Sequence, residues 1–330
     1  MSTPIRIVKA LIIPVITAVV LECICVMIQG QNIITNIKSF DNFMVYTAIV
    51  MITTIALSIN LNSGRFDFSL GSMAALSSVL GAKITYHFLG GGENSAALML
   101  VLSLAFGAVL GLISGLIYVS LRIPPIISSL AVTLIYEGVM YTVTDGKYLM
   151  GEVQNSSMSA FVGTWVNPAL IIGIVLVLSI LVFDYTKFGY DYKALRSGQK
   201  VAVNTGINEV KNALICYVIC GGLMGLVGFL NAARNTTING GQLNFGSIAI
   251  MFTAFLPMFI GSYISRFCNE KNGFLLAAVC MSLLNSTFAV LSNQLTASMQ
   301  SIINAVLLVV FLIYLNNENL LKKILSPLKK

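Results

Sequence analysis

The chain has 330 residues, of which 57% are hydrophobic and only 9% charged, and 19 Lys and Arg against 12 Asp and Glu give a formal net charge of +7. Soluble domains carry about 25% charged residues, so this composition excludes a soluble domain and indicates a chain that lies in lipid. The basic residues are scattered among the ends of hydrophobic segments, which argues against nucleic acid as a partner and for the lipid bilayer.

Ten segments have the length and character of membrane helices, for which roughly 20 apolar residues are needed. Barrel strands are shorter, and backbone groups in lipid must be satisfied within each segment, so the segments are expected to be helices. We predict an all-α polytopic membrane protein, with one transmembrane domain over residues 1–330. Its predicted helices cover 10–29, 43–61, 67–87, 96–120, 124–144, 167–184, 212–232, 245–264, 273–291 and 298–316.

The weakest of these segments is 67–87, because it contains Asp67, Lys83 and several serines. With this helix included and the N-terminus inside, only Lys38, Lys83, Lys147 and Arg234 fall outside, and the rest of the 19 basic residues, Lys322, Lys323, Lys329 and Lys330 among them, fall inside. Positive residues concentrate in cytoplasmic loops, so the charge distribution supports ten helices with both termini in the cytoplasm. Dropping 67–87 would place the basic loop 186–211 outside, against this rule.

The residue types that could act in catalysis or bind a metal do not form a recognisable motif in this sequence. The six cysteines lack the spacing of a zinc site, and His87 is the only histidine. A phosphate-binding loop of the form GxxxxGK[ST] is absent from the sequence. We therefore expect no catalytic residues, no metal and no cofactor bound by this chain, and any ATP must be bound by another chain.

A polar, glycine-bearing break separates the helices predicted at 43–61 and 67–87. It runs from Asn60 to Ser72 and includes Gly64 and Gly71, which permit backbone geometry that other residues resist. Such a break at membrane depth is tolerated where it is buried in protein or lines a water-filled path. The alternative is an ordinary cytoplasmic turn. On the first interpretation, the candidates for a translocation path are Asn60, Asn62, Ser63, Asp67, Ser69 and Ser72.

The segment 186–211 is the longest predicted cytoplasmic loop. Short apolar groups, including Ala194-Leu195 and Val201-Ala202-Val203, lie among its charges, and Gly198 and Gly206 separate them. This pattern favours one or two short helices on the inner face that dock into a groove on a cytoplasmic partner. The alternative is a solvated linker that holds positive charge inside.

Glycines recur at four-residue spacing in two predicted helices. They are Gly107, Gly111 and Gly115 in one helix and Gly221 and Gly225 in another. Small residues on one face allow helix backbones to approach closely, so these positions are predicted helix-packing sites.

An ordered series of motifs in residues 43–235 resembles the permease subunits of ribose-type ABC importers. Ser63-Gly64 and Asp67-Phe-Ser69-Leu-Gly71-Ser72 are similar to that family's "SGIDLSVGS" motif. Arg122-Ile-Pro-Pro-Ile-Ile and Thr144-Asp-Gly146 resemble its "PxFIxTL" and "TxG" elements. Thr186-Lys-Phe-Gly189 and Thr205-Gly206-Ile207-Asn208 resemble its cytoplasmic "TxxGR" and "SGIN" elements.

The resemblance implies about ten helices, a dimer of permeases, a cytoplasmic ABC ATPase that binds ATP with magnesium, and an extracytoplasmic solute-binding protein. The loop 186–211 would receive the ATPase, through Gly189, Ala194, Leu195, Ala202, Gly206, Ile207 and Asn208. The solute would be a sugar or related small polar molecule, carried across the cell membrane.

The sequence also departs from that family. Glu137 stands where the family often has Arg, Gln199 and Lys200 replace acidic residues, and the glycine-rich motif expected after residue 245 is not visible. These departures suggest a specialised subunit that pairs with a different permease chain.

Two other functions remain open from the sequence. An ion-coupled secondary transporter could use Glu22, Asp67 or Glu137, since charges inside membranes are functional by default. A membrane assembly partner without a transport path is the second alternative. A membrane enzyme is least favoured, because the polar residues do not cluster into a nucleophile, acid–base or metal set.

Overall fold

The structure is a computed structural model that describes residues 3–316. The four C-terminal lysines assigned above to the inner side lie outside these residues. Within the described range, the helices are α1 (Thr3–Gln29), α2 (Ile37–Asn62), α3 (Leu70–Leu89), α4 (Ser95–Leu121), α5 (Pro125–Thr144), α6 (Ser156–Val162), α7 (Val166–Tyr185), α8 (Lys187–Ser197), α9 (Gln199–Asn204), α10 (Glu209–Asn235), α11 (Ile248–Phe252), α12 (Phe255–Ile264), α13 (Glu270–Val290) and α14 (Ala297–Asn316). Two short strands, β1 (Tyr148–Leu149) and β2 (Ile238–Asn239), pair antiparallel.

Eight of these helices are long and apolar enough to cross a membrane: α1, α2, α4, α5, α7, α10, α13 and α14. The predicted class, an all-α polytopic membrane protein, is confirmed.

Asparagine caps define several helix starts, since the Oδ1 atoms of Asn36, Asn208 and Asn269 accept backbone N–H bonds from Ser39, Lys211 and Lys271.

Helix α3 corresponds to the weak segment 67–87 and is not among the eight. It packs against α4, α5 and α10 and is buried over most of its length. The hydroxyls of Ser72, Ser77 and Ser78 donate to the backbone carbonyls of Ser69, Ala74 and Ala75. Because neighbouring helices shield it from lipid, α3 tolerates a polar sequence that hydropathy alone would reject.

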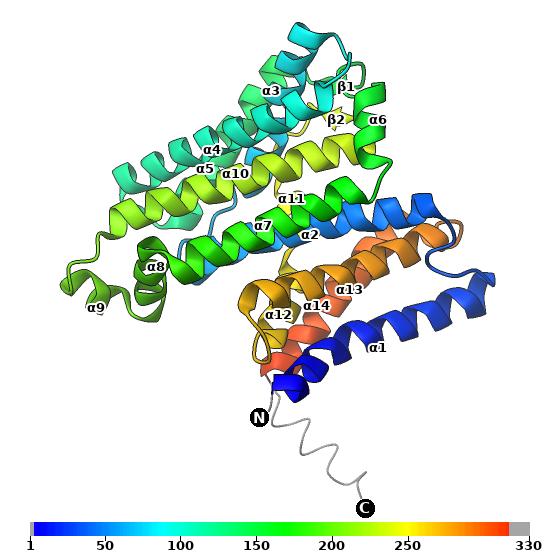
Figure 1. The fold of residues 1–330 in the computed structure, drawn as a ribbon. Helices are drawn as coiled ribbons and strands as arrows, with labels where there is room; N and C mark the ends of the chain where they lie inside the picture. The colour runs from blue at the N-terminus through cyan, green and yellow to red at the C-terminus, as the bar shows by residue number, and fades with distance from the viewer. Residues whose placement is uncertain (1–2, 317–330) are drawn as a thin grey trace, which may run out of the picture. The chain divides into compact units, whose positions relative to one another are not determined.

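The chain forms two compact units. The larger comprises residues 36–254, and α10 lies at its centre, in contact with α2, α3 and α4. Within this unit, α8 and α9 lie at one end of the long helices, and α6, β1 and β2 lie at the opposite end (Figure 1). In the basic segment 186–211, the predicted short helices are present as α8 and α9.

The glycines of α4 and α10 form the contact between these two helices. A β-carbon added at Gly107, Gly111, Gly221 or Gly225 would clash with backbone atoms of the facing helix. Gly115 meets the side chains of Tyr217 and Leu214 instead. The two backbones therefore approach as closely as small residues permit.

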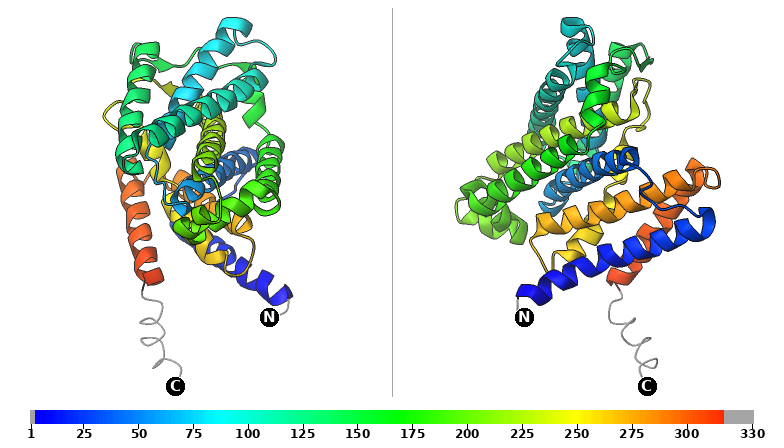
Figure 2. Two further views of the ribbon diagram at one scale, coloured as in Figure 1. Left: turned by 90° about the vertical axis from the view of Figure 1, so that its left-hand side faces the viewer. Right: turned by 45° about the vertical axis from the view of Figure 1, so that its right-hand side comes forward.

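The smaller unit comprises residues 3–35 and 255–316 of the described chain. Helix α13 packs against α1 and α12, and α12 also contacts α14. The right-hand view of Figure 2 shows α1 running beside α13. Leu21, Cys25 and Ile33 form a small core against Leu283 and Leu284.

One predicted helix, 245–264, is wrong as a single element. The structure has the short helix α11 and then a new helix, α12, from Phe255. Asn244 and Phe245 have positive φ angles of 56° and 68°, so the helix cannot begin at 245. Pro257 would interrupt a continuous helix, but it is tolerated in the first turn of α12.

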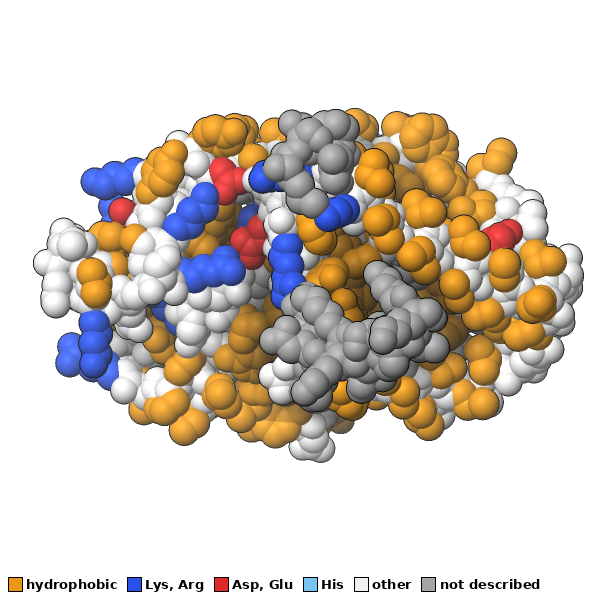
Figure 3. Space-filling model, turned by 90° about the horizontal axis from the view of Figure 1, so that it is seen from below, with side chains coloured by type: hydrophobic (Ala, Val, Ile, Leu, Met, Phe, Trp, Pro, Cys, Tyr) orange, Lys and Arg blue, Asp and Glu red, His pale blue; other side chains and the backbone are white. Residues whose placement is uncertain are grey.

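The described surface is largely apolar. Helix α14 has no buried residues, and α1 exposes a series of large hydrophobic side chains. Hydrophobic side chains dominate the face in Figure 3, where the visible Lys and Arg lie toward the left side and middle. Such a surface suits hydrocarbon rather than water.

Candidate functional site

A cavity of about 390 Å³ lies inside the larger unit, within a bundle of membrane helices. Helices α2, α3 and α10 form three of its walls, and the segment from Thr237 to Thr253 forms another. Its polar lining residues are Tyr46, Ser78, Asn231, Asn235, Thr237, Asn239, Gln242 and Thr253.

The cavity is uncharged, and apolar side chains such as Ile49, Val50 and Ile250 lie in its wall beside the polar ones. Amide and hydroxyl side chains line it, and Asp, Glu, Lys and Arg are absent from its lining. The Oε1 atom of Gln242 is buried and has no hydrogen-bond partner among the described residues. A buried acceptor left open costs free energy, so this atom requires a donor from water or from a bound molecule. The arrangement can bind a neutral molecule that is rich in hydrogen-bonding groups.

Close helix packing and an aromatic contact shape two sides of the cavity. Gly228 of α10 lies against the backbone of Ala74 in α3, where a β-carbon would clash. The guanidinium of Arg234 lies 4.9 Å from the centre of the Tyr46 ring. This cation–π contact holds Tyr46 of α2 to the end of α10 that carries the amides.

The predicted path residues of the segment 60–72 lie elsewhere, at the turn from α2 to α3. The Asp67 carboxylate accepts bonds from Ser69 N (2.8 Å), Ser69 Oγ (2.6 Å) and Asn60 Nδ2 (3.3 Å). Ser63 and Ser72 donate to the backbone carbonyls of Asn60 and Ser69.

Asn60, Asp67, Ser69 and Ser72 are buried, while Asn62 and Ser63 are half-buried. None of these six residues lines the 390 Å³ cavity. Five of these residues bond within the segment itself, so much of its polar capacity is used in holding the turn.

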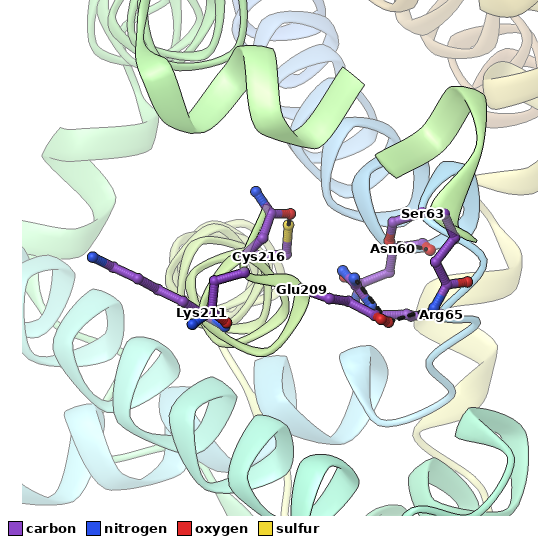
Figure 4. Close-up of polar contacts among 9 residues, drawn as sticks. Asn60, Ser63, Arg65, Glu209, Lys211 and Cys216 are labelled. Carbon is purple, nitrogen blue, oxygen red and sulfur yellow. Dashed lines mark hydrogen bonds and ion pairs between the residues drawn. The ribbon is translucent and has the colours of Figure 1, made fainter. Parts of the chain in front are cut away.

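A buried arginine joins this turn to the start of α10. Arg65 is 3% exposed, and its Nη2 lies 3.8 Å from Oε1 of Glu209. The same Glu209 oxygen accepts a hydrogen bond of 2.6 Å from Nε2 of Gln199 in α9. Figure 4 shows the Glu209 side chain at the start of α10 reaching toward Arg65. The three side chains link α9, α10 and the α2–α3 turn.

A second link ties α8 to the transmembrane helices. The Tyr192 hydroxyl donates a 3.0 Å bond to the Ile59 carbonyl near the end of α2. Phe183 of α7 packs edge-on against Tyr192 at 5.1 Å between ring centres. Gly189 is needed here, because a β-carbon would clash with the backbone of Phe183. The short helices are therefore fixed to the bundle at several points.

The predicted docking residues of this loop face in different directions. Leu195 and Ala202 are buried, whereas Gly206 and Asn208 are exposed, and Ala194 and Ile207 are intermediate. Val201 and Tyr190, at 69% and 60% exposure, are the large apolar side chains of α9 and α8 that lie most open. The apolar surface available to another protein is thus centred on residues next to the predicted ones.

Glu137 of α5 is a buried carboxylate at membrane depth. It is 1% exposed and bonds to the backbone N–H groups of Phe245 and Ser247. A carboxylate that faces lipid costs about 2.5–3.5 kcal/mol on insertion scales, so its enclosure and its partners explain why it is tolerated. Among the described residues, no group of three or more His, Cys, Asp and Glu could hold a metal ion.

The cavity residues were missed in the sequence, although one signal was available. Gly228, Asn231 and Asn235 recur at spacings of three and four in an apolar segment, which places them on one face of α10. Asn239 and Gln242 could not be assigned in this way, because they lie in an irregular segment and reach the cavity only through the tertiary fold.

Comparison with known proteins gives a consistent set of relatives. The chain is 27% identical over 205 residues to the ribose import permease protein RbsC of Escherichia coli strain K12, covering 60% of this chain and 62% of that protein. It is 24% identical over 232 residues to the galactose/methyl galactoside import permease MglC of Haemophilus influenzae, covering 66% and 69%. It is 23% identical over 252 residues to the fructose import permease FruG of Bifidobacterium longum, covering 70% and 72%.

The match therefore spans less than two thirds of the length of the ribose permease. No solved structure matches the chain. The family model described as "Branched-chain amino acid transport system / permease component" matches residues 39–314. Together with the apolar helices, this match over most of the sequence shows that the chain is a multi-pass membrane protein and belongs to that permease family.

Proposed function

We propose that this chain is the membrane-spanning permease subunit of an ABC importer, which moves a small polar solute across the cell membrane. The observation that carries the proposal is the uncharged cavity whose polar side chains come from α2, α3, α10 and residues 237–253. Uncharged amide and hydroxyl groups inside a bundle of membrane helices offer the hydrogen bonds that a transported polar solute needs.

The cavity chemistry and the relatives point to the same class of solute. Amides and hydroxyls both donate and accept hydrogen bonds, as the hydroxyls of a sugar require. The relatives are named as importers of ribose, galactose and fructose. We infer that the solute is a sugar or a related neutral molecule. The segment 60–72 remains a candidate for the inner part of its path, where its contribution would be shape.

Energy would come from a cytoplasmic ABC ATPase that binds ATP with magnesium. We infer that the ATPase docks on α8 and α9, where Tyr190 and Val201 are exposed. Movement there would reach the helices through the links of Tyr192 to Ile59 and of Glu209 to Arg65. A second permease chain, possibly a different one, and an extracytoplasmic solute-binding protein complete the proposed importer.

The ion-coupled alternative has less support. It would need a carboxyl group that is free to take up and release an ion. Asp67 and Glu137 each accept three hydrogen bonds from fixed groups of the chain, and Glu22 accepts one from the backbone N–H of Ile33. These bonds favour structural roles for the three carboxylates.

Uptake in a strain that lacks this gene tests the proposal. Radiolabelled ribose, galactose and fructose are offered to the deletion strain and to the strain complemented with the wild-type gene. We expect uptake of one of these solutes to disappear and to return on complementation. Depletion of cellular ATP should abolish this uptake, whereas an ionophore that collapses ion gradients at constant ATP should not. Uptake that follows the ion gradient instead would select the secondary transporter.

A further inference from the structure

We propose that Glu137 is the positioning residue that holds one wall of the polar cavity in place. It acts through the segment of residues 238–247, here called the strap, which leads from β2 to the residue before α11. The role in solute binding rests on the function proposed above, but the role in holding the strap does not.

Glu137 holds the end of the strap next to α11, here called its inner end, with three hydrogen bonds. Its Oε2 accepts from the Phe245 N–H at 2.9 Å, and its Oε1 accepts from the Ser247 N–H at 2.8 Å and from the Ser247 hydroxyl at 2.6 Å. Both oxygens of a carboxylate are acceptors, so the group matches a pair of backbone donors that no helix or strand satisfies. Irregular backbone at membrane depth needs such partners.

The end of the strap at β2, here called its outer end, is held by the end of α5 and the residues that follow it. Strand β2 pairs with β1, and the Gly240 N–H donates to the Lys147 carbonyl at 3.2 Å. The Thr144 hydroxyl, at the end of α5, lies 3.1 Å from the Gly240 carbonyl oxygen. Helix α5 and the residues that follow it thus fix the strap at two points, and Glu137 supplies the inner one.

The strap needs this second point because its conformation there is unfavourable. Asn244 and Phe245 both have left-handed backbone angles, which residues with side chains rarely adopt. Such angles persist where the surroundings over-determine them. Glu137 bonds directly to the N–H of Phe245, and the Ser247 carbonyl packs tightly against Gly71 of α3.

The fastened strap forms part of the cavity. Ile238, Asn239 and Gln242 line it from the strap, and Ala249, Ile250 and Thr253 line it from the following residues. Glu137 itself does not line the cavity. Its removal should therefore loosen the wall that carries Gln242 without taking away a group that touches the solute.

Thiol accessibility of a cysteine at position 242 tests the proposal without transport. The Gln242→Cys reporter is introduced into a Cys23→Ser background, because Cys23 is the one native cysteine classed as exposed among the described residues. A small hydrophilic maleimide is applied to membrane vesicles, and an Asn94→Cys reporter, on an exposed loop, calibrates reagent access.

Glu137→Gln is the test variant, since an amide offers one acceptor where the strap needs two. Leaving a buried donor unsatisfied shifts a local opening equilibrium, so labelling at position 242 should rise at least ~5-fold. Asp145→Asn, an exposed carboxylate that follows α5, is the matched control and should leave labelling unchanged. Ser247→Ala removes the hydroxyl bond alone and should raise labelling about twofold.

Unchanged labelling at position 242 in both Glu137→Gln and Ser247→Ala, with the protein inserted, would overturn the proposal. If Glu137→Gln fails to accumulate, the Ser247→Ala result decides. In uptake assays, Glu137→Gln should raise the half-saturating concentration more than it lowers the maximal rate. Faster labelling in a chain that supports no uptake of any solute would keep the strap assignment and reject the proposed function instead.

Discussion

Replacing Gly221 by valine is expected to prevent the larger unit from packing, so that little folded protein remains in the membrane. A β-carbon at this position would clash with the Gly107 carbonyl and would lie 2.7 Å from the Gly111 Cα, so backbone atoms of α4 would have to move. Overpacking commonly costs about 1–3 kcal/mol, and a clash between two backbones belongs at the upper end or beyond. The amount and thermal stability of detergent-solubilised protein, followed by size-exclusion chromatography, measure the effect.

Gly173→Val is the matched control for this prediction. Gly173 also lies in the middle of a membrane helix, α7, but nothing lies within 4 Å of the position its β-carbon would take. The control variant should accumulate and melt as the wild type does. Equal loss of protein in both variants would mean that valine is not tolerated in these helices in general, and the close α4–α10 contact would not be the cause.

Replacing Val201 by aspartate is expected to abolish uptake while the protein still inserts normally. Val201 is 69% exposed on α9, on the apolar surface proposed to receive the ATPase. A charge placed in an apolar interface is desolvated and left unpaired. This costs roughly several kcal/mol of binding free energy, which we expect to prevent docking. ATP hydrolysis by the purified complex should become independent of the solute, and crosslinks between α9 and the ATPase should be lost.

Three further variants separate docking from other effects. Val201→Leu keeps the surface apolar and should retain uptake. Asn94→Asp adds the same charge on the other side of the membrane in the proposed topology, and it therefore controls for the effect of a negative charge as such. Ala202→Asp should also uncouple hydrolysis from transport, but by a different route, because Ala202 is buried and its substitution disturbs how α9 sits on the chain. Full uptake by Val201→Asp would reject α9 as the docking surface.

Much of the fold could be predicted from the sequence, because lipid imposes one requirement on every segment. Long apolar segments must satisfy their backbone internally, and each of the ten predicted segments has a helical counterpart. Hydropathy alone would have missed α3, because its polar residues lower the hydropathy of the segment. Helices α4, α5 and α10 shield these residues. The distribution of basic residues along the sequence indicated the helix instead.

Other parts of the fold gave no usable signal. Strands β1 and β2 have two residues each, and Tyr148 pairs with Asn239 across a long stretch of sequence, so no periodicity marks them. The break between α11 and α12 was missed because hydropathy continues through it. Pro257 was the available warning in the sequence, whereas the positive φ angles of Asn244 and Phe245 depend on the tertiary fold.

The candidate site was harder to predict than the fold. Polar residues in a membrane sequence either face a cavity or satisfy the chain itself, and sequence alone does not separate these cases. Asn60, Asp67 and Ser69 bond to one another, whereas Asn231 and Gln242 line the cavity. Glu137 was recognised as an intramembrane carboxylate, but its partners, Phe245 and Ser247, are more than a hundred residues away in sequence.

The central claim is that the polar cavity is the solute path, and uptake by an Asn231→Leu variant tests it most directly. Leucine has nearly the shape of asparagine but cannot form a hydrogen bond. Leu223→Met is the control, because Leu223 lies on the same helix but lines an apolar groove between α4, α7 and α10. Such a swap conserves volume and is well tolerated.

Uptake of the solute identified in the deletion strain is measured in cells that contain equal amounts of each variant. The loss of a hydrogen bond to the solute, with a polar group of the solute left unpaired, should raise the half-saturating concentration about tenfold for Asn231→Leu. Leu223→Met should transport as the wild type does. Wild-type uptake by Asn231→Leu would contradict the assignment of this cavity as the solute path.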